Sequence, residues 1–396
     1  MSTPPYGDAS RPVLLTTHLI GDVNRSRVLQ ALVDNGPLSR ADLARLAGVP
    51  RATMGTIVQA LLDAGLLEEG DHHRDGRVGK PSRPLWFGPR AGLSVAVAFD
   101  DTSVRGALVS ARGERLNDVR MPLATADASS EALLKTLREV VTAVLPSDEA
   151  VMGIGIAVPG VCNTPAGEVV GSGQLPGAVG TAITRSLAKA FGVPVLVDND
   201  ARAQALGERW FGDGRGAATF ASLQTGTGLG VGLVLDGRLF RGEDGRVGEL
   251  GHTQVVPDGD RCRCGLRGCW ETVATLPWLR AEARRRRLLD ASRTTTASLT
   301  ALATTGATRL LADYATNLGA GLSSLVNLLG VRRIIAHGDI LGGGEAMRLL
   351  VEDAVREASL GYLRPEVTLT FSELGADATV TGAAALVLSE TFRLAA

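Results

Sequence analysis

The sequence is poor in aromatic residues, cysteine and lysine, and it contains no long apolar run. Aromatic residues make up 4% of the 396 residues, and three of the 41 basic residues are lysines, which we attribute to genome composition. No window reaches the roughly 18–20 apolar residues that a membrane-spanning helix needs. The start of the chain also lacks the basic and then apolar pattern of a signal peptide. These absences argue against a membrane or secreted protein, and we expect a cytoplasmic one.

Neither sign of charge is in large excess. Residues 1–90 hold 11 Lys and Arg against 9 Asp and Glu, whereas the remainder holds 30 against 33. Such a small asymmetry does not by itself indicate a nucleic-acid partner. The length predicts two or three domains, and the hydrophobic content of 45% is typical of globular α/β proteins.

Three of the four cysteines stand close together although cysteine is scarce. Cys262, Cys264 and Cys269 form a C-x-C-x4-C pattern shortly after His252, and the fourth, Cys162, lies 100 residues before Cys262. Thiolates and imidazoles are the usual ligands of tetrahedral Zn²⁺, and four of them close a structural site. The sequence therefore predicts structural zinc at His252, Cys262, Cys264 and Cys269. A reduced loop with incidental cysteines and a redox trigger are the alternatives.

Apolar residues recur with helical spacing in the first ninety residues. They are Val28, Leu29, Leu32, Leu43, Leu46, Ile57, Val58, Leu61 and Leu62. Gly36-Pro37 ends the first helix, and Ser39 with Asp42 indicates a capping box at the second. Gly48-Val49-Pro50 forms the tight turn before a third helix, Arg51–Ala64, which Gly65 ends. This order predicts a helix-turn-helix.

Polar side chains on and beside the third helix could read DNA. Short or polar groups at the outward positions suit the major groove, and a basic hairpin after Leu67 suits phosphates. The predicted DNA contacts are Ser39, Arg51, Thr53, Thr56, Gln59, Arg74, Arg77 and Lys80. We expect a flexible N-terminus over residues 1–20, a winged helix-turn-helix over 21–88, and a linker within 84–92. A purely structural three-helix bundle is the alternative.

From Leu93 onward, strand and helix patterns alternate twice. The expected strands are 93–99, 105–109, 151–158, 193–197, 217–223, 230–235 and 333–336, and the expected helices are 130–144, 181–191 and 307–329. Each half begins with a strand, a polar turn and another strand. The pattern predicts an α/β body over residues 93–396.

The segment Gly248–His252, followed by C-x-C-G-x-x-G-C-x-E, resembles the signature of the ROK family of repressors, open reading frames and sugar kinases. The resemblance implies an actin-like, hexokinase-like body in which two α/β lobes flank a cleft. It also implies that the zinc loop, residues 252–271, adjoins a sugar pocket, and that Glu249, His252 and Glu271 contact a hexose. Such groups can bind several hydroxyls at once. The helix-turn-helix region resembles that of MarR-like and ROK repressors.

A second motif, Val197–Ala201 followed by A-L-G-E, resembles the N-D-A-N segment of the family's sugar kinases. The resemblance implies that Asn199 binds a sugar hydroxyl and that Asp200 binds the sugar and, in a kinase, is the catalytic general base. The family's second Asn corresponds to Arg202 or Gln204 here. An aspartate at a helix N-terminus is the alternative reading, and both can hold together.

Thr225, Gly226, Thr227 and Gly228 begin a T-G-T-G-L-G turn between two apolar strands. Backbone N–H groups in such turns bind anions, and the turn matches the family's second phosphate loop. We interpret it as the remnant of a phosphate loop.

The nucleotide side departs from the family pattern. Where kinases have D-x-G-G-T, this chain has Ala98-Phe99-Asp100-Asp101-Thr102, so the first aspartate is lost and two acids replace glycines. Carboxylates at these positions repel a polyanion. After strand 333–336 the G-G-G turn is replaced by His337-Gly338-Asp339, although glycines follow at 342–344. These losses argue against ATP use.

We therefore expect a sugar-responsive DNA-binding transcriptional regulator, a repressor of carbohydrate genes, rather than an enzyme. Its partners would be operator DNA, read as two half-sites by a homodimer or homotetramer, and a sugar that closes the lobes. An ATP-dependent hexose kinase with an appended DNA-binding domain is the runner-up. A regulator controlled by a protein partner, with a vestigial sugar site, is the third reading. Gln174 and Ala178 depart from the commoner Asn and Trp, so the effector sugar stays open.

Overall fold

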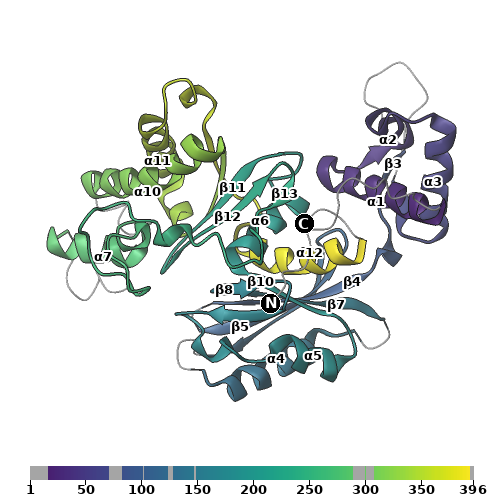
Figure 1. Ribbon diagram of the computed structural model, residues 1–396, viewed down its shortest axis with the longest axis horizontal. Coiled ribbons are helices and arrows are strands. Elements are labelled where there is room, and N and C mark those ends of the chain that lie inside the picture. The colour runs from purple at the N-terminus through teal and green to yellow at the C-terminus, as the bar shows by residue number, and fades with distance from the viewer. Residues whose placement is uncertain are drawn as a thin grey trace, which may run out of the picture.

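The computed structural model describes residues 17–70, 83–100, 102–123, 128–146, 149–288, 299 and 307–392. A winged helix and two α/β lobes make up this part of the chain (Figure 1), which is the fold class that the sequence predicts. No helix in the described ranges combines the length and apolar character needed to cross a membrane.

Three helices and a small sheet form the winged helix. Helices α1, α2 and α3 span Thr17–Asn35, Arg40–Ala47 and Arg51–Asp63, and strands β1, β2 and β3 span Leu38–Ser39, Leu67–Glu69 and Pro84–Phe87 in the order β1-β3-β2. The predicted capping box is present, because Ser39 Oγ accepts from the Asp42 backbone N–H at 3.2 Å and the Asp42 carboxylate accepts from the Ser39 N–H at 3.4 Å. Gly48 ends α2 with φ +63°, a conformation that favours glycine.

Two expectations for this region are wrong. The tract 84–92 is not wholly a linker, because its first four residues are β3, which pairs with both β1 and β2. Burial alternates along β3, with Leu85 and Phe87 fully buried, and only Gly88–Gly92 connects it to the next domain. Residues 17–20, expected in a flexible N-terminus, belong to α1.

The first lobe is built on a five-stranded sheet in the order β10-β7-β4-β5-β6. The strands of this sheet are β4 Leu93–Phe99, β5 Ser103–Ser110, β6 Arg115–Pro122, β7 Val151–Val158 and β10 Val195–Asn199. The lobe also contains helices α4 Ser130–Val144 and α5 Ile183–Phe191 and a hairpin of strands β8 Val161–Asn163 and β9 Glu168–Gly171. Because β4 and β10 both run parallel to β7, their carboxyl ends meet at one edge of the sheet. That edge brings Phe99 and Asn199 to the same side of the lobe.

The second lobe has a five-stranded sheet in the order β13-β12-β11-β14-β15. Its strands are β11 Phe220–Thr225, β12 Leu229–Leu235, β13 Arg238–Leu239, β14 Arg333–Gly338 and β15 Thr368–Phe371, and its helices are α7 Leu276–Arg285, α10 Thr308–Leu329 and α11 Gly344–Ala358. The T-G-T-G turn joins β11 to β12. Since β11 and β14 are parallel, Thr225 pairs with Gly338 at the end of both strands.

Two buried helices, α6 (Asp200–Phe211) and α12 (Ala378–Phe392), pack against each other between the sheets (Figure 1). Their backbones touch at Gly382, where an added β-carbon would lie 1.7 Å from the carbonyl oxygen of Ala203. Glycine is therefore required at this crossing. Helix α6 begins at the cleft and ends beneath the winged helix.

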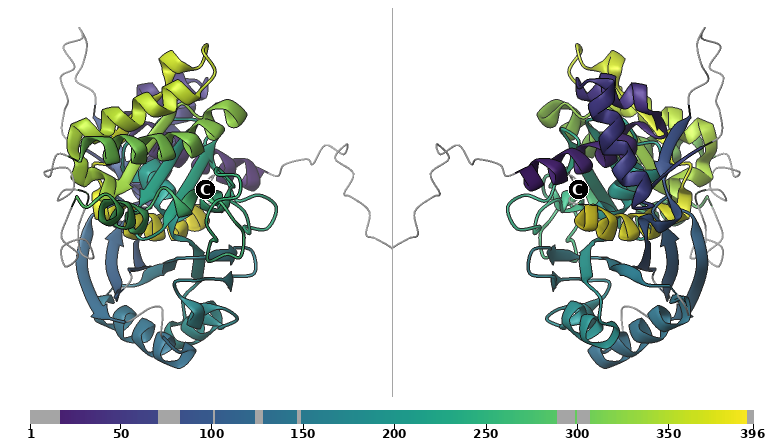
Figure 2. Two further views of the ribbon diagram at one scale, coloured as in Figure 1. Left: turned by 90° about the vertical axis from the view of Figure 1, so that its left-hand side faces the viewer. Right: turned by 90° about the vertical axis from the view of Figure 1, so that its right-hand side faces the viewer.

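The winged helix packs directly on the body (Figure 2). The ring of Phe87 stacks on Phe392 of α12 at 5.6 Å between centroids and on Trp210 of α6 at 6.0 Å. Arg209 of α6 donates to Asp34 of α1 at 3.0 Å. One continuous set of buried side chains thus joins α1–α3 to α6 and α12.

Candidate functional site: an interlobe cleft beside a thiolate cluster

A cleft of about 950 Å³ opens between the lobes. All five residues predicted to bind sugar line it, namely Asn199, Asp200, Glu249, His252 and Glu271. They come from the start of α6, from the short turn Leu250–His252 with the residue before it, and from the turn Trp270–Thr272. The structure therefore brings together residues that lie up to 72 positions apart in the sequence.

Asn199 and Asp200 form the floor of the cleft. Asn199 caps α6 by accepting from the Arg202 N–H at 3.1 Å, and its amide nitrogen donates to Gly160 O and Asp200 Oδ1, both at 3.0 Å. Its side chain is therefore largely committed to positioning Asp200. Burial, with the nearby Glu249 charge adding to it, raises the pKa of Asp200 to about 6. A carboxyl group in that range can act as an acceptor or donor for a hydroxyl.

The predicted metal ligands form one cluster. The ligand atoms of His252, Cys262, Cys264 and Cys269 lie within 4.8 Å of one another. His252 Nδ1 lies 3.5 Å from Cys262 Sγ, and Cys264 Sγ lies 3.6 Å from Cys269 Sγ. These spacings suit ligands placed about 2.0–2.3 Å from a tetrahedral ion. The donor set and its geometry fit a metal ion, and the other ring nitrogen of His252 faces Glu249 Oε2 at 4.0 Å.

Arg263, which the sequence analysis does not single out, pairs with Glu271. Its Nε lies 2.8 Å from Glu271 Oε1, and its Nη2 donates to Oε2 at 3.0 Å. A fork of this kind fixes the plane of the carboxylate. Because Arg263 stands between Cys262 and Cys264, the cysteine loop determines where Glu271 points. Both residues line the cleft.

An ion cluster centred on the buried Asp198 lies next to Asn199. The carboxylate of Asp198 accepts from Arg202 Nε at 2.6 Å and from Arg241 Nε at 2.8 Å. Arg202 Nη1 also donates to Val247 O at 2.8 Å, close to Glu249. Arg202, one of the two candidates for the family's second Asn, therefore holds the loop before Glu249 and does not line the cleft.

The T-G-T-G turn has three residues at the cleft and one in the protein interior. Gly226, Thr227 and Gly228 line the cleft, whereas Thr225 is buried. The Thr225 hydroxyl donates to His337 O at 3.0 Å and accepts from the Ile340 N–H at 3.1 Å. It thus fastens the turn to the end of β14.

On the nucleotide side expected from the sequence, Ala98 and Asp100 line a second cavity. Burial opposes ionisation of Asp100, but hydrogen bonds from Ser103 and Thr102 and the Arg120 charge outweigh it and lower its pKa. His337 and Asp339 do not line this cavity among the described residues. The imidazole of His337 is instead buried 3.4 Å from Glu208, and burial lowers its pKa to about 4. The His337 side chain therefore points away from this cavity, and the loss of the G-G-G turn there is a change of backbone sequence only.

The helix-turn-helix surface is partly as expected. Arg51, Thr53, Thr56 and Gln59 are exposed on α3. Ser39 is 8% exposed and its hydroxyl is engaged in the α2 cap, so its geometry does not suit a DNA contact. The predicted wing residues Arg74, Arg77 and Lys80 lie outside the described residues.

Comparison with known proteins places both parts of the chain. Residues 94–390 match the ROK family and residues 22–78 match the MarR family. The chain is 26% identical to the xylose repressor of Bacillus subtilis (92% of this chain, 95% of that one). It is 27% identical to the DNA-binding transcriptional repressor Mlc of Escherichia coli (92% and 93%).

Solved structures agree with these matches. A ROK family transcriptional regulator described as a homologue of E. coli Mlc superposes with a TM-score of 0.75 at 29% identity, covering 94% of this chain and 97% of that one. A ROK family glucokinase from Streptomyces griseus, solved with glucose and AMPPNP, gives 0.66 at 26% identity and covers 74% of this chain and 99% of that one. Together with the cysteine loop and the two-lobed body, these matches establish that the chain belongs to the ROK family.

Proposed function

We propose that this protein is a sugar-responsive transcriptional repressor whose winged helix binds operator DNA and whose cleft binds the effector. Relatives that match over nearly the whole chain are named as repressors, including the xylose repressor and Mlc. The observation that carries the proposal is that the winged helix shares its hydrophobic core with α6 and α12, the helices that pack between the lobes. A sugar bound at the start of α6 therefore acts on the same rigid element that supports the DNA-reading domain.

Helix α6 provides the proposed route of communication. Its first residues, Asp200 and the capping Asn199, face the cleft, and its last turn contacts α1 and β3 through Arg209 and Trp210. Lobe closure around a sugar would move this helix and tilt the winged helix on the body. The sugar can shift DNA affinity only by its own preference for one of the two states.

We further propose that His252, Cys262, Cys264 and Cys269 hold a structural Zn²⁺. Bound zinc would cross-link the loop and contribute directly to its folded stability. The loop in turn orients Arg263, and through it Glu271, while His252 directs its free nitrogen toward Glu249. Two of the proposed sugar contacts thereby depend on the loop.

A sugar kinase is the second candidate, and one observation favours it. The pKa of Asp200 is raised to about 6, which suits a general base near neutral pH. Against it, Ala98 replaces the family's first phosphate-loop aspartate, and the Asp100 carboxylate stands where a phosphate would approach. We therefore propose a regulator without kinase turnover, which as a homodimer or homotetramer would read two operator half-sites.

The proposal is tested by fluorescence anisotropy with an operator selected from random DNA by the purified protein. We expect at least one saccharide, in a panel of xylose, glucose, N-acetylglucosamine and disaccharides, to change the Kd for this DNA by about 5-fold or more, the usual lower range of allosteric coupling. ATP-Mg should have no effect, and no phosphorylated sugar should form. DNA binding that ignores every sugar would favour control by a protein partner, and turnover abolished by Asp200→Asn would establish the kinase.

A further inference from the structure

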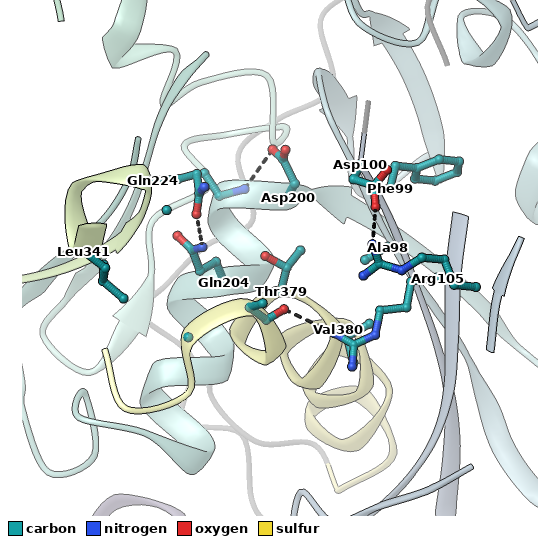
Figure 3. A pocket seen from close by; sticks show the side chains of 15 residues that line it. Ala98, Phe99, Asp100, Arg105, Asp200, Gln204, Gln224, Leu341, Thr379 and Val380 are labelled. Carbon is teal, nitrogen blue, oxygen red and sulfur yellow. Dashed lines mark hydrogen bonds and ion pairs between the residues drawn. The ribbon is translucent and has the colours of Figure 1, made fainter. Parts of the chain in front are cut away.

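The second cavity, on the nucleotide side, is still without a role in the proposed function. It encloses about 430 Å³ between the ends of β4 and β5 in one lobe, the first turns of α6 and α12, and the end of β14 (Figure 3). Five residues line both this cavity and the larger cleft: Phe99, Asp100, Asp200, Ala201 and Gln224. The two hollows are therefore continuous, and Asp200 stands where they join.

The floor of the cavity carries two side-chain amides. Gln204 Nε2 donates to Gln224 Oε1 at 2.6 Å, Ser222 donates to Gln204 Oε1 at 3.1 Å, and Gln224 Nε2 donates to Thr225 O at 3.1 Å. Each amide nitrogen has two hydrogens. Within the described structure, each of these two glutamines therefore keeps one N–H free. Thr379, which also lines the cavity, adds a hydroxyl (Figure 3).

The cations of the cavity are already paired. Arg105 lies 2.8 Å from Asp377, contacts Asp118 in a bidentate arrangement, and donates to Ala376 O at 3.3 Å. Arg120 lies 3.0 Å from Asp100. These partners consume the charge that a phosphate chain would need, and Asp200 adds a further carboxylate at the junction. The chemistry disfavours a polyanion and suits a neutral ligand rich in hydroxyl groups.

Size also favours a ligand longer than one sugar ring. The cleft alone is near the top of the range of roughly 300–1,000 Å³ that accommodates drug-sized ligands, and the cavity extends it beyond Asp200. A single hexose is much smaller than a drug-sized molecule. Seven glycines line the cleft, so few side chains limit its width: Gly160, Gly171, Gly173, Gly226, Gly228, Gly230 and Gly248.

We propose that the nucleotide-side cavity is a second sugar subsite, so that the effector is a neutral disaccharide or longer oligosaccharide. One ring lies against Asp200, Glu249, His252 and Glu271. The next ring lies beyond Asp200 against Gln204, Gln224 and Thr379. This proposal rests on the proposed function, because it assigns the effector class of the same regulator.

The test is isothermal titration of the full chain with xylose, glucose, galactose and mannose and with their α- and β-linked disaccharides. We expect at least one disaccharide to bind 10-fold or more tightly than its own monosaccharide. Thr379→Phe, which fills the cavity from α12, should remove that gain while changing the monosaccharide Kd by less than 2-fold. Leu341→Trp fills the same space from the β14 side and should act alike if the first variant does not fold. Thr370→Phe, on the exposed face of β15, is the matched control and should change neither affinity.

Each other outcome overturns the proposal. If disaccharides bind no more tightly than monosaccharides, or if both filling variants leave disaccharide binding intact, the cavity is not a subsite, while monosaccharide binding would still support the proposed function. Binding of ATP-Mg that Thr379→Phe abolishes would make the cavity a nucleotide site. If no saccharide binds, the effector class and the proposed function fail together.

Discussion

Asp200 is the residue whose ionisation most directly links stability to the cleft. Its pKa is raised from 3.8 to about 6, so the folded protein retains a proton that the unfolded chain has already released. Between these two pH values the free energy of unfolding falls as pH rises. The total fall is at most about 3 kcal/mol, because a shift of one pKa unit is worth about 1.36 kcal/mol. The full contribution is present below about pH 4 and is lost above about pH 6.

We therefore predict that Asp200→Asn is more stable than the wild type at pH 7 and that the difference disappears near pH 4. Urea unfolding at both pH values measures it. Asp244→Asn, at an exposed ion pair whose acid has a lowered pKa, is the control and should show no such gain at pH 7. Equal stability of wild type and Asp200→Asn at pH 7 would show that burial in the cleft does not destabilise the ionised form of this carboxyl group.

The residues of the candidate site fall into two groups according to how the sequence reveals them. Asn199, Asp200, Glu249, His252 and Glu271 belong to short contiguous motifs, so they can be recognised from the sequence. The partners that orient them are distant in sequence and depend on tertiary structure. Arg241 reaches Asp198 across 43 positions, and the Gln204–Gln224 amide pair spans 20. Neither pair forms a local pattern, and Arg263 has no significance until Glu271 is seen to point toward it.

At the scale of elements, some apolar segments are predicted well, whereas α7 and α11 are not among the expected helices. The bounds of β4, β7 and α4 agree with the sequence analysis at every residue, since the pattern of apolar residues marks them clearly. β6 is missed because it is a polar edge strand whose residues are largely exposed. β3 is taken for linker because a strand of four residues that begins with Pro84 carries little periodic signal. It is recognisable as a strand only by its pairing with β1 and β2, which lie earlier in the sequence.

The cysteine loop is an element whose order should depend on metal. We predict that Cys264→Ser removes bound zinc, lowers the melting temperature and weakens sugar binding 10-fold or more, because the loop positions Arg263 and Glu271. Cys264 is exposed, so the substitution itself removes little packing. Elemental analysis and a thermal-shift titration measure these effects. Cys162→Ala is the control, since Cys162 is buried and is not a member of the cluster, and it should keep the metal. A Cys264→Ser protein with unchanged melting temperature and sugar response would refute this role for the loop.

At the scale of the whole molecule, the sequences of the winged helix and the body do not predict how the two domains pack together. The contacts of the winged helix with the body come from single residues in separate segments: Asp34 with Arg209, Phe87 with Trp210 and Phe392, and Glu68 with Arg112. A sequence pattern that predicts two domains leaves open whether a loose linker or a packed interface connects them. The packed interface makes a mechanical link between sugar and DNA feasible.

That link can be tested by comparing two ion pairs across the same interface. Arg209–Asp34 connects α1 to α6, whereas Arg112–Glu68 connects β2 to the β5–β6 turn and includes no residue of α6. We predict that the double variant Arg209→Met/Asp34→Ala still binds sugar and DNA separately but that the sugar changes its DNA affinity at least 5-fold less. Arg209 is buried and Asp34 is half-buried, and replacing such a pair by apolar groups is often close to neutral for stability, so the fold should survive. By reciprocity, DNA should change sugar affinity less by the same factor, which titration with and without operator measures. Arg112→Met/Glu68→Ala should retain full coupling. If both double variants lose coupling equally, the interface acts as a whole and α6 has no special part in it.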